Sequence, residues 1–191
     1  MNRRWMFLGG AALALAAPAV RAAVPRRLAF RHAATGASFD GPWDEADPSA
    51  MAALSAALAD SSAIRPRPFD AEAIGILWEV STAARLPGPL VVRSGYRTPA
   101  INAAVNGAGD SQHLRASALD VEVSAVRMPA VAGIALALGR GGVGMYPSRG
   151  FLHLDSGPVR RWSEGSARTV APVEDRIGRI AAAWRNPGNQ R

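Results

Sequence analysis

In two short segments of this chain, residues 117–123 and residues 151–155, a leucine or a valine recurs at every second position. The apolar positions are Leu119, Val121, Val123, Leu152 and Leu154. A period of two is typical of strands with one buried face, because successive side chains point to opposite sides of a sheet. Both segments are therefore predicted to be strands that pack these leucines and valines on the core.

Helix signals surround the two strands. Asp47-Pro48 and Thr98-Pro99 each combine a capping side chain with a proline, which helices favour in their first turn. Helices are predicted at residues 47–58, 70–86, 98–106 and 129–138. Further strands are predicted at residues 28–31, 37–39, 89–94 and 142–145, the last closing a hairpin with residues 151–155. This pattern predicts a single α+β domain in which a small antiparallel sheet packs against helices.

Positive charge is concentrated at one end of the chain. The formal net charge is +7, but residues 23–157 hold twelve arginines and twelve acidic residues. After Pro158, seven arginines face three acidic residues. A neutral body with a basic tail does not provide the basic groove that nucleic acids require, so no nucleic-acid partner is expected.

The basic tail, residues 163–191, carries a predicted amphipathic helix. Its apolar face consists of Val173, Ile177, Ile180 and Trp184. One interpretation is that this face packs on the domain and adds to the core. The other is a weak contact between the basic side of the helix and an anionic lipid or wall polymer.

Residues 1–22 have the layout of an export signal peptide. Arg3 and Arg4 precede an apolar run, and small residues suited to cleavage follow it. The arginine pair indicates the twin-arginine type. The protein is therefore expected in the periplasm, as a monomer; an uncleaved N-terminal anchor is the alternative. Since the chain has no cysteine, a domain at residues 23–162 would depend on its own core and not on disulfides.

Two of the three histidines lie in or beside the alternating strands. Strand periodicity places Asp120 and His153 on the faces opposite the apolar residues, and His113 lies in the preceding loop. Imidazole and carboxylate are ligands that suit zinc, and three protein ligands with one open position are typical of catalytic sites. A site for one zinc per chain is therefore predicted. The alternative is a turn cap at His113, an arginine pair at Asp120 and a surface position for His153.

The sequence around these ligands resembles a known superfamily. Ser111, His113, Ala118 and Asp120 match the Ser-x-His-x-x-Gly-x-Ala-x-Asp signature of the zinc D-alanyl-D-alanine peptidases, which share their fold with the hedgehog signalling domain; Ala116 replaces the glycine. Residues 94–99 resemble the substrate-side element of these peptidases. Residues 142–162 resemble the exported murein endopeptidase K-like branch. The resemblance covers residues 28–162.

The resemblance implies hydrolysis of peptide bonds in peptidoglycan stem peptides. Arg97 would donate hydrogen bonds to the developing oxyanion, although a structural ion pair is its alternative role. Ser111 and Tyr96 are expected to contact substrate; a local turn hydrogen bond is the alternative for Ser111. Asp155 shares a strand face with His153 and is preferred as general base over Glu122, with orientation of a ligand as its other possible role.

Three other residues within the resembling region are not assigned a catalytic role. His32 stands where the branch has His-Thr-Gly-Glu, but the motif is not kept, so a structural or exposed position is expected. Trp43 and Trp162 are expected to flank the cleft; the alternative is that these large aromatic side chains pack in the core.

Two functions follow from this sequence. The first is a zinc peptidase that cleaves peptidoglycan crosslinks, and the second is a non-catalytic module of the same fold that binds peptidoglycan. The three ligands and Arg97 favour the peptidase; the lack of an obvious base and the change at Ala116 favour the binding module. The resemblance favours 3–3 crosslinks between diaminopimelates over 4–3 crosslinks.

Overall fold

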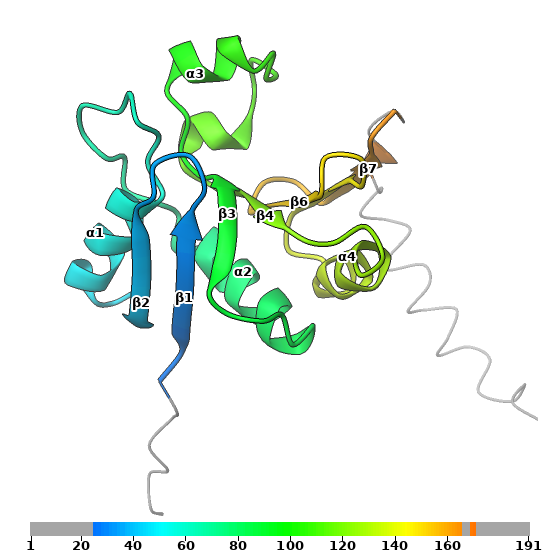
Figure 1. The fold of residues 1–191 in the computed structure, drawn as a ribbon, viewed down its shortest axis with the longest axis horizontal. Coiled ribbons are helices and arrows are strands. Elements are labelled where there is room, and N and C mark those ends of the chain that lie inside the picture. Colours follow the sequence, from blue (N-terminus) through cyan, green and yellow to red (C-terminus); the bar gives the residue numbers. More distant parts are fainter. Residues whose placement is uncertain (1–24, 166–168, 171–191) are drawn as a thin grey trace, which may run out of the picture.

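The computed structural model describes residues 25–165 and 169–170, which form one mixed α/β domain (Figure 1). The predicted signal peptide and the predicted tail helix lie outside these residues. The sheet has eight strands in the order β2-β1-β3-β4-β6-β5-β7-β8. The strands are β1 (Arg27–His32), β2 (Ser38–Pro42), β3 (Leu90–Ser94), β4 (Ala118–Glu122), β5 (Gly142–Tyr146), β6 (Phe151–Asp155), β7 (Arg160–Ser163) and β8 (Thr169–Val170).

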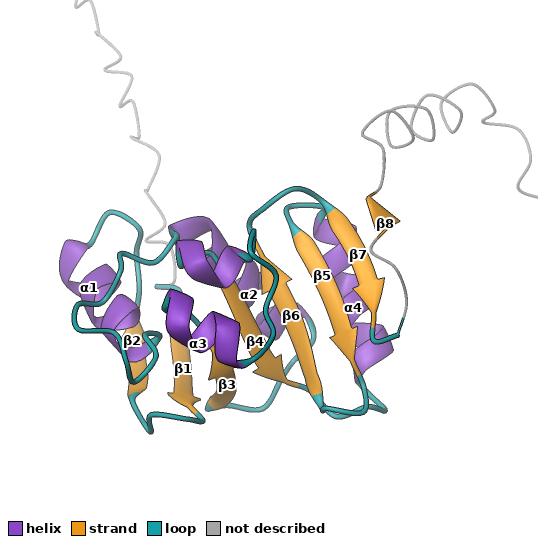
Figure 2. Cartoon of the chain, turned by 90° about the horizontal axis from the view of Figure 1, so that it is seen from above, coloured by secondary structure: helices purple, strands orange, loops and turns teal. Residues whose placement is uncertain are grey.

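Four α-helices accompany the sheet: α1 (Pro48–Ala57), α2 (Ala71–Ala83), α3 (Pro99–Ala104) and α4 (Met128–Leu138). All four were predicted, and Asp47 and Thr98 cap α1 and α3 through their side chains. In Figure 2, α2 and α4 lie behind the sheet and α3 lies in front of it. The two faces of the sheet therefore differ: one is covered by helices, and the other is partly open.

The alternating strands pack as predicted. Leu119, Val121, Leu152 and Leu154 belong to the hydrophobic core, and each is at most 2% exposed. β4 and β6 are antiparallel neighbours, and Asp120 lies directly opposite His153. Because the leucines and valines face the helices, these two polar residues are directed to the other face.

The sheet is neither small nor wholly antiparallel, so that part of the fold prediction is wrong. β1 pairs with β3 in parallel, and β5 pairs with β7 in parallel. In the first pairing, β2, α1 and α2 lie between the two strands in the chain, which provides the length that a parallel connection requires. In the second pairing, the chain leaves β6, crosses β5 and runs back beside it as β7, in the same direction as β5. The sheet therefore continues beyond the β5–β6 hairpin. β8 then pairs with β7.

A bulge in β3 redirects its last side chain. Val92 pairs with Val121 on the core side, whereas Ser94 pairs with Asp120 on the other side, so the register shifts between them. One extra residue in a strand reverses the face on which the following side chains lie. The bulge therefore brings Ser94 to the same face as Asp120.

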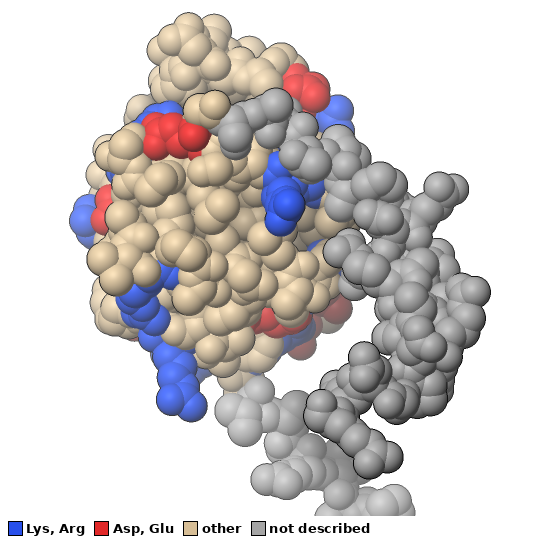
Figure 3. Space-filling view, turned by 90° about the vertical axis from the view of Figure 1, so that its right-hand side faces the viewer, with Lys and Arg blue, Asp and Glu red and all other residues tan. Residues whose placement is uncertain are grey.

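One face of the described surface carries few charged side chains. The face shown in Figure 3 carries isolated arginines and acidic residues on a largely uncharged background. Among the residues that the structure describes, no helix has the length and apolar character needed to cross a bilayer.

Candidate metal centre

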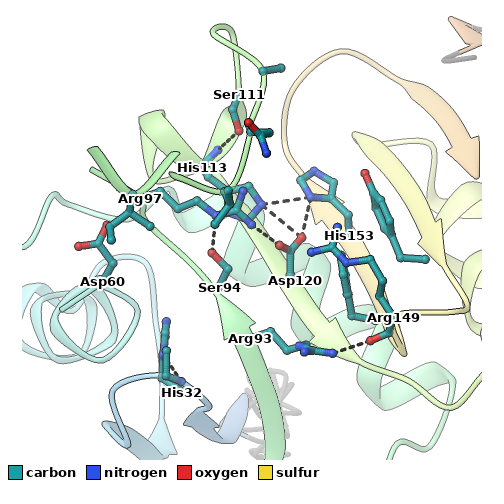
Figure 4. A pocket seen from close by; sticks show the side chains of 18 of the residues that line it. His32, Asp60, Arg93, Ser94, Arg97, Ser111, His113, Asp120, Arg149 and His153 are labelled. Carbon is teal, nitrogen blue, oxygen red and sulfur yellow. Dashed lines mark hydrogen bonds and ion pairs between the residues drawn. The ribbon is translucent and has the colours of Figure 1, made fainter. Parts of the chain in front are cut away.

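Three predicted ligands meet on the open face of the sheet. Asp120 and His153 come from the paired strands β4 and β6, and His113 comes from the 3₁₀ helix η1 (Gln112–Arg115). Nε2 of His113 lies 3.2 Å from Oδ1 of Asp120 and 3.2 Å from Nδ1 of His153. That Nδ1 lies 2.9 Å from the same carboxylate oxygen. Figure 4 shows the three side chains converging at one end of a pocket.

Each imidazole is held through its outer nitrogen. Nδ1 of His113 lies 2.7 Å from the carbonyl oxygen of Gly95, and Nε2 of His153 lies 2.8 Å from Oδ2 of Asp155. Since a carbonyl or carboxylate oxygen can only accept, these outer nitrogens carry the protons. In the neutral rings, the inner nitrogens then present lone pairs towards Asp120. The two inner nitrogens and the carboxylate oxygen are then all acceptors, and no hydrogen lies between them. A bound cation would relieve the repulsion among their lone pairs.

Burial and neighbouring charges shift the pKa values of the three residues in this cluster. Burial lowers the pKa of His113. Burial alone would raise the pKa of Asp120, but the two histidines hold it well below its usual range. Burial would also lower the pKa of His153, whereas the hydrogen bonds that its charged form can donate to Asp120 and Asp155 raise it. The carboxylate of Asp120 therefore stays ionised, and a positive charge beside it is favourable.

Asp155 lies behind His153 and is fixed on all sides. Its side chain is 0% exposed and pairs with Arg160, whose NH2 lies 2.7 Å from Oδ2 and whose NH1 lies 3.0 Å from Oδ1. The backbone N–H groups of Gly142 and Gly157 also donate to Oδ1. Although burial raises the pKa of Asp155, its bond to His153 and the charge of Arg160 bring it down to about 2.

Arg160 received no role from the sequence. The available signal was the spacing of an aspartate and an arginine across the short turn between β6 and β7. That signal is weak, because it becomes informative only once β7 is known to lie beside β5.

Arg97 supports the other oxygen of Asp120. Its NH2 forms an ion pair with Oδ2, and its Nε donates to Oγ of Ser94 at 2.7 Å. Its side chain is 16% exposed and lines the pocket. The geometry therefore includes the ion pair considered for Arg97 and also leaves part of the guanidinium facing the cavity.

The cluster opens into a cavity of about 560 Å³. Ser111 lines this cavity, and its Oγ also accepts from the backbone N–H of His113 at 3.4 Å, as the N-cap of η1. Tyr96 does not line it; its side chain packs against the hydrophobic core. The structure thus brings Ser111, but not Tyr96, to the predicted site.

The three residues without an assigned catalytic role, which are His32, Trp43 and Trp162, lie in different places. Trp162 lines the cavity, and its ring centroid is 5.1 Å from that of His153. Trp43 is instead buried in the core, which is the packing role considered as its alternative, so its predicted place beside the cleft is wrong. His32 is buried and also lines the cavity.

Two backbone positions beside the site, Ala116 before β4 and Gly95 after β3, suit glycine or hold it. Ala116 has φ 56°, a left-handed conformation that favours glycine, which is the usual residue of the signature at this position. Gly95 approaches the chain closely, because a Cβ there would lie 2.4 Å from the carbonyl oxygen of Leu58. The approach sets the Gly95 carbonyl against His113.

Gly144 is predicted to be essential for the packing of Trp162. A Cβ at this position would lie 2.3 Å from the indole ring, which is held by its hydrogen bond to Tyr146. The variant Gly144→Ala should lose about 1–3 kcal/mol of unfolding free energy, because the ring must move. Thermal denaturation measures this loss. Gly133→Ala is the matched control: it lies on α4 with nothing near the added methyl, so equal or higher stability is expected, and equal losses would contradict the explanation.

Comparisons with known proteins identify the family of this chain. The family model described as peptidoglycan L,D-endopeptidase MepK matches residues 20–162. A Haemophilus influenzae protein named "Probable peptidoglycan L,D-endopeptidase MepK" is 30% identical over 176 residues, covering 84% of this chain and 95% of that protein. The peptidoglycan L,D-endopeptidase MepK of Escherichia coli K12 is 33% identical over 79 residues, covering 39% of this chain and 43% of its own length. The chain therefore belongs to the peptidoglycan L,D-endopeptidase MepK family.

Proposed function

We propose that this protein is a zinc-dependent endopeptidase that cleaves peptide crosslinks of peptidoglycan. The observation that carries the proposal is the convergence of His113, Asp120 and His153 in the wall of a cavity, in a chain of this family. The names of the relatives describe an L,D-endopeptidase, and we further propose that the bond cleaved here is the 3–3 crosslink between diaminopimelates, as the resemblance of the sequence implies.

The three donor atoms fit a single zinc ion. They lie within 4.8 Å of one another and are supplied by two imidazoles and one carboxylate, the ligand types that zinc prefers. Both imidazoles also have the outer hydrogen-bond partners that usually orient histidine ligands. Zinc held there would supply Lewis-acid polarisation of the scissile carbonyl and a nucleophile at neutral pH.

The remaining groups position and stabilise the substrate. Arg97 faces the cavity beside Asp120, and its planar guanidinium carries several N–H donors, so it can donate to the oxygen that becomes negative during hydrolysis. Ser111 lines the same cavity and can bind a carboxylate or backbone group of the substrate. Trp162 forms an apolar wall next to His153.

Asp155 suits the role of a positioning residue better than that of a general base. Its carboxylate is fully buried, faces the outer nitrogen of His153 and is occupied by Arg160. Glu122 is not among the residues that line the cavity. Within the described part of the chain, the carboxylates that do line it are Asp60 and Asp120.

The variant Asp155→Asn is expected to bind zinc about 10- to 100-fold more weakly, because the outer partner of His153 loses its charge. Competition with a chromophoric chelator measures the affinity. Activity at saturating zinc should recover towards that of the parent, because the variant still holds the ligand set. Unchanged affinity with lost activity would instead identify Asp155 as the base.

A non-catalytic module that binds peptidoglycan is the second candidate function. It is favoured by the state of the described carboxylates near the cluster, none of which is both free and open to the cavity. Asp120 is a proposed ligand, Asp155 is buried behind His153, and Asp60 accepts hydrogen bonds from Ser62 and Thr98. Incubation of the purified protein with digested murein, followed by mass spectrometry, distinguishes the two. New stem-peptide products from 3–3 crosslinked substrates support the endopeptidase. Intact crosslinks with binding to sacculi would support the module.

We also propose that residues 1–22 direct export to the periplasm, because the proposed substrate, peptidoglycan, lies in that compartment. A monomer carrying one complete site is the proposed form, since all three ligands come from one chain.

A further inference from the structure

His32 lies at the end of β1, where the chain turns towards β2. It is 2% exposed. Its Nδ1 lies 3.3 Å from the backbone nitrogen of Ala34 and 3.3 Å from that of Thr35. Both backbone groups can only donate, so Nδ1 is an acceptor, and the imidazole helps to hold the turn. This agrees with the structural role expected from the sequence.

The same two hydrogen bonds determine where the ring carries its proton. With Nδ1 accepting, the neutral imidazole is protonated at Nε2. Burial lowers the pKa of His32, in spite of the opposing charge of Asp60, so the ring is neutral at pH 7. His32 thus presents one N–H donor of known position.

That donor is unused within the described chain. Nε2 is buried and has no hydrogen-bond partner there, although His32 lines the cavity of the metal centre. Figure 4 places His32 at the opposite end of this pocket from His153. A buried N–H without an acceptor is costly, so an acceptor supplied by a ligand would be bound favourably.

The surroundings select the kind of acceptor. Asp60 lines the same cavity and its negative charge acts on His32, so a second carboxylate beside this ring would be repelled. A neutral peptide carbonyl has the required lone pairs without the charge. We propose that Nε2–H of His32 donates a hydrogen bond to a peptide carbonyl oxygen of the substrate, at a position remote from the bond that is cleaved.

This inference rests on the proposed endopeptidase function and extends it to how an extended peptide is held. A contact remote from the reacting atoms is expected to be made equally in the ground state and the transition state. Its loss should therefore raise KM and leave kcat nearly unchanged.

Two variants separate the donor from the turn. His32→Asn places an oxygen near Nδ1, which can accept from Ala34 and Thr35, but it removes the donor at Nε2. His32→Gln can return an N–H to the position of Nε2. With a 3–3 crosslinked muropeptide, His32→Asn should raise KM about 3- to 10-fold, the loss typical of one hydrogen bond. His32→Gln should recover part of this loss, and Arg31→Ala, exposed on the same strand, should match the parent.

Imidazole nitrogen NMR tests the inference without a variant. The chain has three histidines, so labelling them gives six nitrogen signals. Nε2 of His32 should appear as a protonated nitrogen and should shift when a soluble stem peptide is added. An unshifted signal together with a parent-like KM for His32→Asn would overturn the inference, as would equal losses in both His32 variants. If the parent protein cleaves no murein bond, the proposed function fails, and the NMR shift decides the inference alone.

Discussion

Replacement of His153 by alanine is expected to remove the bound metal and all measurable hydrolysis. His153 is at the centre of the cluster, with one nitrogen directed to Asp120 and His113 and the other anchored by Asp155. Loss of one of three protein ligands leaves two, which is fewer than catalytic zinc sites use. Metal content should fall from about one zinc per chain to a small fraction, as measured by mass spectrometry of the purified protein under native conditions. His113→Ala and Asp120→Ala should behave in the same way.

The control for this prediction is Arg161→Ala. Arg161 is exposed on β7 and does not line the cavity, so this variant should keep both zinc and activity. Circular dichroism of each variant shows whether the fold is retained. Full zinc occupancy in folded His153→Ala would show that the ion is held elsewhere and would refute the ligand assignment.

Replacement of Arg97 by alanine is expected to lower turnover by about 10²–10³ while zinc remains bound. This is the loss typical of removing one donor to a developing oxyanion. The side chain also pairs with Asp120, so metal content must be measured on the same samples. Arg97→Lys is the companion variant: it keeps the charge but loses the planar fork, and an intermediate turnover is expected.

Two results would contradict this role. Turnover near that of the parent would mean that no rate-limiting charge is stabilised by Arg97. A parallel loss of zinc and activity would mean that its ion pair with Asp120 is its main contribution, which is the structural role considered from the sequence.

Local patterns made much of the fold predictable. The alternation in β4 and β6 set which side chains enter the core, because one face of each strand is buried by α2 and α4. Caps at Asp47 and Thr98 set the first residues of two helices. The parallel pairings could not be read in this way, because they depend on which strands become neighbours after distant segments fold. β7 is short and contains two arginines, so it carries no alternating apolar signal.

The candidate site shows the same division between local and distant information. The cluster of three proposed ligands could be predicted because a motif with fixed spacing contains two of them and a short strand contains the third. Their supports were not, since the carbonyl of Gly95 is a backbone group and Arg160 acts through a turn. The unused donor of His32 depends on the pocket and on two backbone contacts, neither of which has a sequence signature.

Zinc removal and titration is the measurement that tests the proposed metal-dependent hydrolysis most directly. The protein is treated with a chelator, dialysed, and assayed on 3–3 crosslinked muropeptides while zinc is added back in steps. Hydrolysis should vanish in the metal-free protein and return in proportion to zinc, with saturation at about one ion per chain. Full hydrolysis in protein shown to be free of metal, or none in fully loaded folded protein, would contradict a zinc endopeptidase built on His113, Asp120 and His153.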